Sequence, residues 1–540
     1  MQRMIETAHR PVVMGLNGAV TSGHPLGSAV GLRILQQGGS AVDAIVAMAA
    51  AVGVVEPQMS GVGGDGFTLV YDAQAGRVFT VNGTGAAPTG ATLDAYSDGI
   101  PKIGPRAASV PGAVGGWAAM HARWGRLAFG DVLQPAAELA EQGWPVSHNL
   151  AVDFANAATG LGSFVTTRSA YFPGGGPPAP GTVLRQPALA ATLREIAASN
   201  GEALYRGALA ERLARAVQAD GGYIDAKSLA AYEPEVTEPL AVGYRGLTVY
   251  EPGPNSTGHV LLQELAMTEL LDLASMRSPS AELVHHMVEI KKLAFEDRER
   301  YAADPRVFRP LPDELLTTAY ARQRILTIDA AQARAQATAD VAADGNTTYL
   351  AAMDEDGNVA SMTTSINGAF GSCYVAGDTG ILMNNRMTYW HLDPLHPNAL
   401  APGKRVRHTV SPALALRDGR PTMAIGTPGA DGQVQTIYQV FVNIVDFGMN
   451  LQQAVEQPRW RSFVDGQDAN WPHHSSNELR IEGRMPATVI EGLQARGHIV
   501  VRDLEWFSGM GSVQVIQRDP ETGVLSVGSD PRRDAYGMAY

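Results

Sequence analysis

The stretch Asp344-Gly345-Asn346-Thr347-Thr348-Tyr349 lies in the middle of the 540-residue chain, and the interpretation of the whole sequence depends on it. It is a small polar turn, and the residues that follow it, 349–353, predict a β-strand. A second predicted strand, 359–365, comes after the turn-forming run Asp354-Glu355-Asp356-Gly357-Asn358, so that the two strands form a hairpin. The sequence therefore places a pair of threonines where a polar turn enters a hairpin.

A threonine in this position can act as a nucleophile if the chain is cut directly before it. The hydroxyl is a weak nucleophile unless a base lies beside it. An N-terminal threonine supplies that base itself, because its free α-amine titrates at roughly 7.7–8.0 and lies within reach of its own side chain. Our hypothesis is that cleavage between Asn346 and Thr347 makes Thr347 a nucleophile, although a Thr-Thr pair alone is also typical of an ordinary strand.

Composition narrows the class of protein. The formal net charge of -13 disfavours nucleic acids and anionic membranes as partners, because both are polyanions. The single cysteine, Cys373, excludes an intrachain disulfide and is expected to be a packing residue. Residues 1–15 lack a signal-peptide pattern, and the apolar run 44–55 is too short to span a bilayer. We therefore expect a soluble, cytoplasmic protein.

The hydrophobic patterns predict helices and strands without regular alternation. Helices are predicted at 27–37, at 41–55, where Ser40 and Asp43 form a capping box, and at 280–302. Further strands are predicted at 67–71, 244–250, 381–383, 413–416 and 422–426. Strands enclosed by helices in this way favour an α+β layered architecture.

Several common motifs are absent or misplaced. Gly61, Gly63 and Gly66 match the letters of a dinucleotide-binding loop, but a helix precedes them and a strand follows, so they more readily allow backbone to approach backbone. The sequence contains no G-x-S-x-G elbow, no Walker loop and no Cys/His zinc spacing. The adjacent pair His285-His286 points to different helix faces, and the pair His473-His474 is expected to be solvated. We therefore predict neither a cofactor nor a metal.

Separated motifs in a fixed order make the chain resemble the γ-glutamyltranspeptidase family of N-terminal-nucleophile hydrolases over almost its whole length. The motifs are Gly38-Gly39-Ser40-Ala41-Val42-Asp43-Ala44, Glu56-Pro57-Gln58, Val110-Pro111-Gly112, Gln134-Pro135-Ala136, Leu229-Ala230-Ala231-Tyr232, Tyr244-Arg245-Gly246, Thr347-Thr348, Asp356-Gly357-Asn358, Asn367, Phe370-Gly371, Ala376-Gly377, Gly380-Ile381-Leu382, Asn384-Asn385-Arg386-Met387, Ser411-Pro412 and Gly426-Thr427-Pro428-Gly429.

The resemblance implies a four-layer αββα sandwich built jointly by two subunits. Cleavage between Asn346 and Thr347 would give a large subunit, residues 1–346, and a small subunit, residues 347–540, which together form one intertwined domain. Thr347 would then attack an amide carbonyl and form an acyl-enzyme, which water or an amine resolves.

Other catalytic roles follow from the same resemblance. Ser365 takes the place of the family's second threonine, whose hydroxyl supports the new amino terminus, and Asn367 matches an asparagine near the nucleophile. Gly429 and Ala430 stand where a Gly-Gly pair forms the oxyanion hole with its backbone N–H groups. Alanine keeps its N–H, and such donors are worth about 2.7–4 kcal/mol each.

The residues expected to hold the substrate depart from the family pattern. Thr84 stands where glutamate-binding members have the arginine that grips the α-carboxylate, and Tyr389 stands where they have an acidic residue for the α-amino group. Arg386 occupies a variable position, and His408 and Thr409 replace two serines. For Arg386, a surface position and a binding role are both open. Without this arginine and this acidic residue, the chain lacks the contacts on which γ-glutamyl specificity depends.

The favoured substrate is therefore an amide of a small acid, such as oxamate. A true γ-glutamyltransferase or glutathione hydrolase with a rebuilt glutamate pocket remains an alternative, as does a cephalosporin or glutaryl acylase. An unprocessed, non-catalytic binding protein is the alternative from a different class. The expected partners are the small-molecule substrate, a water or amine acceptor and the two subunits of one precursor, and homo-oligomer formation is left open.

Overall fold

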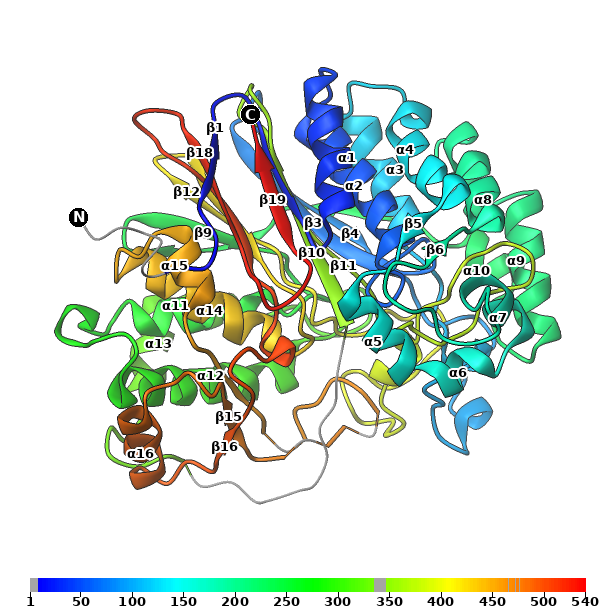
Figure 1. Ribbon diagram of the computed structural model, residues 1–540. Coiled ribbons are helices and arrows are strands. Elements are labelled where there is room, and N and C mark those ends of the chain that lie inside the picture. Colours follow the sequence, from blue (N-terminus) through cyan, green and yellow to red (C-terminus); the bar gives the residue numbers. More distant parts are fainter. Residues whose placement is uncertain (1–7, 335–345, 465, 472, 475) are drawn as a thin grey trace.

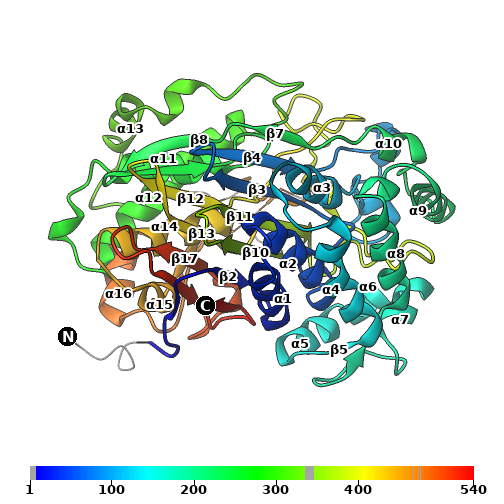
Figure 2. The same ribbon diagram turned by 90° about the horizontal axis from the view of Figure 1, so that it is seen from above.

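Two seven-stranded antiparallel sheets face each other at the centre of the molecule (Figure 1). The computed structural model describes residues 8–334, 346–464, 466–471, 473–474 and 476–540. Helices cover the outer face of each sheet, so the order of layers is helix, sheet, sheet, helix (Figures 1 and 2). The predicted α+β sandwich of four layers is confirmed.

The first sheet holds the threonine pair on one of its inner strands. Its spatial order is β19 (Tyr536–Ala539), β2 (Ala19–Ser22), β10 (Asn346–Met353), β11 (Val359–Asn367), β3 (Asp65–Asp72), β4 (Arg77–Gly83) and β7 (Glu235–Thr237). The second sheet has the order β1 (Val13–Gly15), β18 (Leu525–Ser529), β17 (Gln514–Arg518), β13 (Arg420–Gly426), β12 (Ala413–Arg417), β9 (Leu247–Glu251) and β8 (Leu240–Tyr244). Both sheets contain strands from both sides of Asn346, so neither predicted subunit could form either sheet alone.

The helices form two groups, one on the outer side of each sheet. On the side of the first sheet lie α1 (Pro25–Gln36), α2 (Ala41–Val55), α3 (Ala113–Trp124), α4 (Phe129–Gln142), α5 (His148–Asn156), α6 (Ala158–Gly162), α7 (Val165–Tyr171), α8 (Pro187–Ala198), α9 (Ala208–Ala219) and α10 (Ala226–Ala230), with α8 packed on the outer side of α4. Those beside the second sheet are α11 (Gly258–Thr268), α12 (Ala281–Tyr301), α13 (Thr318–Ile325), α14 (Gly432–Val445), α15 (Leu451–Glu456) and α16 (Ala487–Ala495). Small sheets are formed by β14 (Trp460–Ser462), β15 (Leu479–Ile481) and β16 (Val500–Arg502), and by β5 (Trp144–Pro145) and β6 (Val183–Leu184).

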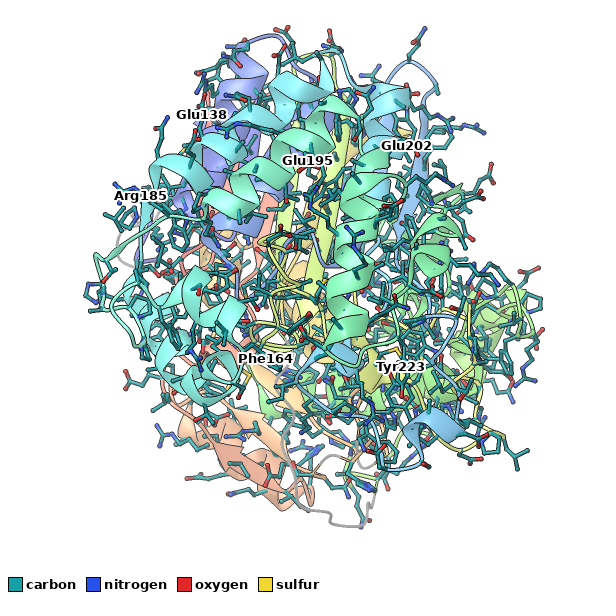
Figure 3. The ribbon with its side chains drawn as sticks, turned by 90° about the vertical axis from the view of Figure 1, so that its right-hand side faces the viewer. Glu138, Phe164, Arg185, Glu195, Glu202 and Tyr223 are labelled. Atoms are coloured by element: carbon teal, nitrogen blue, oxygen red, sulfur yellow. The ribbon has the colours of Figure 1, made fainter. Side chains whose placement is uncertain are left out.

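Three apolar cores hold the four layers together. One fills the space between the first sheet and its helices, with α2 buried along nearly its whole length. A second lies between the second sheet and helices α11, α12 and α14. The third joins the two sheets through residues such as Tyr349, Leu414 and Ile516. Figure 3 faces the outer side of the first helical layer, where Glu138 of α4 and Glu195 of α8 are labelled.

Local sequence signals account for the elements nearest the site. Ser40 and Asp43 form the predicted capping box at the start of α2. The predicted β10–β11 hairpin is also confirmed, and Asp354 closes its turn by accepting a hydrogen bond from the N–H of Asn358 at 2.9 Å. Cys373 is buried, as expected of a packing residue.

Two strand predictions are wrong. Residues 244–250 do not form one strand, because Arg245 and Gly246 have φ values of 48° and 77° and turn the chain between β8 and β9. Residues 381–383 form no regular strand: Leu382 and Met383 make only isolated bridges, to Val375 and Gly63. Within the described residues, no helix combines the length and the apolar character needed to cross a membrane.

Candidate active site

Thr347 lies at the beginning of β10, where the pairing with β11 is irregular. Asn346 is opposite Asn367 and Thr348 is opposite Thr364, so the register shifts across Thr347. Such a shift changes the direction in which a side chain points and is common next to active sites. The Thr347 side chain is buried, with an exposed fraction of 3% for the residue.

A chain of hydrogen bonds joins the Thr347 hydroxyl to the carbonyl of the preceding residue. The Thr347 hydroxyl donates to Ser365 Oγ at 3.2 Å. The Ser365 hydroxyl in turn donates to the carbonyl oxygen of Asn346 at 2.8 Å. The N–H of Asn367 also donates to Ser365 Oγ at 2.8 Å and fixes its position. Ser365 therefore touches both the predicted nucleophile and the predicted scissile peptide group.

Asn367 continues this network away from β11. Its φ of 76° is left-handed, and its side-chain nitrogen donates to the carbonyl of Asn385 and to the side chains of Thr388 and Asn470, at 3.0–3.2 Å. Its buried side-chain oxygen has no hydrogen-bond partner among the described residues. That oxygen is available as an acceptor next to the Ser365 network.

Gly429 and Ala430 form a turn between β13 and helix α14. Their φ values are 133° and 46°, and the N–H of Gly432 donates back to the carbonyl of Gly429 at 2.8 Å. The turn precedes the first residues of a 14-residue helix, where free N–H groups and the helix dipole favour negative charge. This is the setting that an oxyanion hole requires.

A cavity of about 660 Å³ opens beside these groups, with both Asn346 and Gly429 in its wall. The wall also contains acidic, basic and apolar side chains. The acidic ones are Glu56, Asp153 and Asp534, the basic ones are Arg461, Arg532 and Arg533, and the apolar ones include Met59, Ile103, Val152 and Phe507. The cavity has the size of a small-molecule site.

Glu56 is a candidate functional residue that the sequence analysis did not single out. It accepts a hydrogen bond from the Thr348 hydroxyl at 3.1 Å, one residue from the nucleophile, and it also lines the cavity. Burial raises its pKa to about 8. The motif Glu56-Pro57-Gln58 marks the position in the sequence, but the contact with Thr348 spans 292 residues and is not visible there.

The structure brings together most of the residues predicted to contact substrate. Arg386 and Tyr389 lie on a 3₁₀ turn, Arg386–Tyr389, and the guanidinium lies 4.6 Å from the centre of the Tyr389 ring. The Tyr389 and Thr409 hydroxyls are 3.1 Å apart. The fourth residue, His408, lies 6.2 Å from Tyr389 between ring centres. We call these residues the polar cluster: Arg386, Tyr389, His408 and Thr409.

Arg386 is buried and already paired, which rules out the surface position left open for it. Its Nε and Nη2 atoms donate to the two carboxylate oxygens of Asp65 at 3.0 and 2.9 Å. Burial alone would lower the pKa of Arg386, but the Asp65 carboxylate raises it above its ordinary value, so the guanidinium is charged. Asp65 is opposite Ser365 in the β3–β11 register, and the pair therefore borders the nucleophile network.

His408 and Thr84 complete this region. Burial lowers the pKa of His408, so the ring is neutral, and neither ring nitrogen has a hydrogen-bond partner among the described residues. The Thr84 hydroxyl donates to the side-chain oxygen of Asn82 at 2.7 Å and accepts from Asn255 at 3.2 Å. The backbone N–H of His408 donates to the carbonyl oxygen of Asn255 at 2.7 Å, so Thr84 is connected to the polar cluster through Asn255.

His473 differs from expectation. It is buried rather than solvated, and its ring stacks on His391 with a centroid separation of 3.5 Å. Separately, His285, Glu289 and His498 are grouped with metal-binding spacing within the described part of the chain, away from the cavity that Asn346 lines. The predicted residues Asp344 and Gly345 lie outside the described residues.

Comparisons with known proteins agree with this geometry. The sequence profile of the family described as Gamma-glutamyltranspeptidase matches residues 27–540. The Glutathione hydrolase-like YwrD proenzyme of Bacillus subtilis is 37% identical over 530 residues, which cover 97% of this chain and 99% of that protein. The Oxamate amidohydrolase proenzyme of Klebsiella pneumoniae is 37% identical over 533 residues, covering 97% and 98%.

A solved structure has the same fold over the whole chain. The cephalosporin acylase from Bacillus halodurans superposes with a TM-score of 0.90 at 35% identity and covers 99% of this chain and 97% of its own. The chain therefore belongs to the gamma-glutamyltranspeptidase family and is a proenzyme amidohydrolase, acting on amide C–N bonds.

Proposed function

We propose that Thr347 first cleaves the peptide bond in front of it and then acts as the N-terminal nucleophile. The observation that carries the proposal is the hydrogen-bond chain from the Thr347 hydroxyl through Ser365 to the Asn346 carbonyl oxygen. Because Ser365 accepts from one reacting group and donates to the other, it can take up the nucleophile's proton and stabilise the developing oxyanion.

Self-cleavage then follows as an acyl shift. Thr347 Oγ forms a bond to the Asn346 carbonyl carbon, the C–N bond breaks, and the released nitrogen becomes the protonated or free α-amine of Thr347. Water hydrolyses the resulting ester and leaves a carboxylate on Asn346. The products are chains of 346 and 194 residues.

In the processed enzyme the α-amine is the base for Thr347. The hydroxyl attacks the substrate amide, the leaving amine takes a proton, and water or a second amine releases the acyl group. The turn at Gly429 and Ala430 supports an oxyanion hole at the start of α14. The unpartnered side-chain oxygen of Asn367 supports a further contact, to a substrate N–H group.

The acyl group that we propose is that of a small acid. Thr84 and Tyr389 are uncharged and stand at the two positions where glutamate-binding family members have charged residues for the glutamyl group. In addition, a relative that is 37% identical is named an oxamate amidohydrolase. The polar cluster holds one cation, Arg386, whose carboxylate partner Asp65 already satisfies two of its donors. This charge supports a short carboxylate or carbonyl as the substrate group bound there.

A bulkier acyl amide is the second candidate, and the cavity beside Asn346 favours it. Its volume of about 660 Å³ exceeds what a small acid needs, and Met59, Ile103, Val152 and Phe507 give it apolar surface. An acylase of a Pseudomonas strain, 37% identical over 526 residues, is among the relatives.

A substrate panel separates these candidates. Purified protein is assayed with oxamate, a glutaryl anilide and a γ-glutamyl anilide, and N-terminal sequencing identifies the small subunit. We expect a new terminus at Thr347, with turnover of oxamate above that of the γ-glutamyl anilide. Preference for the glutaryl anilide would favour the second candidate, and turnover of the γ-glutamyl anilide alone would reject both. Thr347→Ala should yield one uncleaved, inactive chain, and activity in that variant would exclude Thr347 as the nucleophile.

A further inference from the structure

A cluster of three potential metal ligands lies between α12 and the loop that follows α16. His285 and Glu289 are one turn apart on α12 and therefore share a face of the helix. His498 approaches them from the loop before β16. One ligand atom from each residue lies within 4.8 Å of the others, and all three residues are buried, with His285 fully enclosed.

We propose that this cluster binds one divalent transition-metal ion of the zinc class through His285 Nδ1, His498 Nε2 and a carboxylate oxygen of Glu289. Two imidazoles and one carboxylate are a ligand set that zinc uses with water in the fourth position. The site is separate from the reaction proposed for Thr347.

The hydrogen bonds of His285 direct a lone pair into the cluster. Its Nε2 lies 2.8 Å from the carbonyl oxygen of Asp329, which can only accept, so Nε2 carries the proton. In the neutral ring Nδ1 is then unprotonated, and it faces His498 Nε2 at 2.8 Å. A metal-bound histidine commonly donates its other N–H to a backbone carbonyl in this way.

Metal binding rearranges the contact between the two imidazoles, in which His498 Nε2 now donates to His285 Nδ1. When the ion binds, the proton on His498 Nε2 moves to Nδ1 of the same ring, so the charge of the imidazole does not change. The two nitrogens must separate from 2.8 Å to about 3.3 Å, the spacing that tetrahedral zinc–nitrogen bonds give.

Glu289 supplies the negative charge of the site. Its Oε1 accepts from the Lys292 ammonium at 2.7 Å, and its Oε2 accepts a long hydrogen bond, 3.3 Å, from the N–H of Arg334. The Lys292 ammonium repels a cation, so we expect weaker binding than at a site without a neighbouring positive charge. Oε2 has the weaker existing contact and is the oxygen that would turn to the metal.

The fourth coordination position can be reached by water. A cavity of about 210 Å³ has His498, Lys292 and Arg334 in its wall, together with the polar residues Ser462 and Asn477. A cavity of this size with polar walls accommodates several water molecules.

A bound ion would connect three parts of the chain. Through Asp329 and Arg334 it would hold residues 329–334, and through His498 it would hold the loop after α16. The other end of α12 carries Arg298, which donates to Asp431, the residue after Ala430. The site would thus brace the helix that supports the proposed oxyanion turn.

The test compares wild type with His498→Gln and with His286→Gln as the matched control. His286 is the neighbouring histidine on α12, and its Nδ1 contacts the Glu282 carbonyl within its own helix. After chelation and dialysis, each protein is titrated with ZnCl₂ by calorimetry and with CoCl₂ by visible absorption. We expect one ion per chain and tetrahedral cobalt bands in wild type and control, and a zinc-dependent rise in Tm in both.

In His498→Gln the zinc affinity should fall by more than the roughly 10–100-fold that loss of an outer contact causes, and the rise in Tm should disappear. Equal binding by His498→Gln, or no stoichiometric zinc in wild type, would overturn the proposal. If the variant does not fold, X-ray absorption of zinc-loaded wild type decides the matter. Two imidazole ligands support the site, and a spectrum without imidazole excludes it.

Discussion

Replacing Ser365 by alanine is the sharpest test of the self-cleavage geometry. The Ser365 hydroxyl is the donor, at 2.8 Å, to the carbonyl oxygen on which negative charge develops when Thr347 attacks. It is also the acceptor, at 3.2 Å, of the proton that the nucleophile must lose. Loss of one donor to an oxyanion costs about 2.7–4 kcal/mol, which corresponds to roughly 10²–10³ in rate. We therefore expect cleavage of Ser365→Ala to slow by at least this factor.

Cell-free translation with labelled methionine provides the time course, because it starts from an uncut precursor. Conversion of the 540-residue chain to fragments of 346 and 194 residues is followed on a denaturing gel. Ser365→Thr keeps the hydroxyl and should cleave close to the wild-type rate. Thr363→Val is the matched control, since it removes a buried hydroxyl on the same strand that has no hydrogen-bond partner among the described residues. Wild-type cleavage by Ser365→Ala would refute the assigned role of the hydroxyl.

Three further predictions concern stability and are best measured by denaturant unfolding in the uncleaved Thr347→Ala background. Burial raises the pKa of Glu56 from 4.5 to about 8, so the stability that this carboxyl contributes is fully present below pH 4.5 and is lost as the pH rises through about 8. Glu56→Gln should remove a pH dependence on the order of 5 kcal/mol, and identical pH profiles of the two proteins would contradict this. Asp65→Asn leaves the Arg386 charge buried without its carboxylate and should destabilise by about 3–5 kcal/mol, whereas a change below about 1 kcal/mol would mean that the pair is not maintained. Ala430→Gly relieves a left-handed φ of 46° and should stabilise the uncleaved protein by about 1 kcal/mol, and a loss of stability would show that the alanine is not strained. With Thr347 present, the cleaved Ala430→Gly enzyme should keep its activity.

The sequence was most informative where structure depends on neighbouring residues. The capping box at Ser40 and the turn at Asp354–Asn358 are local, and both helix α2 and the β10–β11 hairpin formed as predicted. The turn at Arg245 was missed because arginine is rare at a position with positive φ, although Gly246 follows it. Nothing in the stretch 381–383 distinguishes a regular strand from isolated bridges, since that depends on Gly63, far away in the chain.

The site itself depends on contacts that no local pattern reveals. Arg386 and Asp65 are 321 residues apart, and Glu56 and Thr348 are 292 apart. The sequence could name Arg386 as a candidate for substrate binding, but it could not show that a carboxylate already holds it. The burial of His473 has the same origin, because His391 comes from a different loop.

The residues proposed for catalysis and those proposed for substrate recognition lie in different parts of the fold. Thr347 and Ser365 lie on paired inner strands of the first sheet, where a change of register would disturb two neighbouring strands. Arg386, Tyr389 and His408, in contrast, lie on a short 3₁₀ turn and in a connecting segment outside both sheets. Such segments tolerate substitution while the scaffold keeps the nucleophile in place. Arg386 is held by Asp65 beside Ser365, so we expect exchanges confined to Tyr389, His408 and Thr409 to alter the acyl group that is accepted without affecting self-cleavage at Thr347.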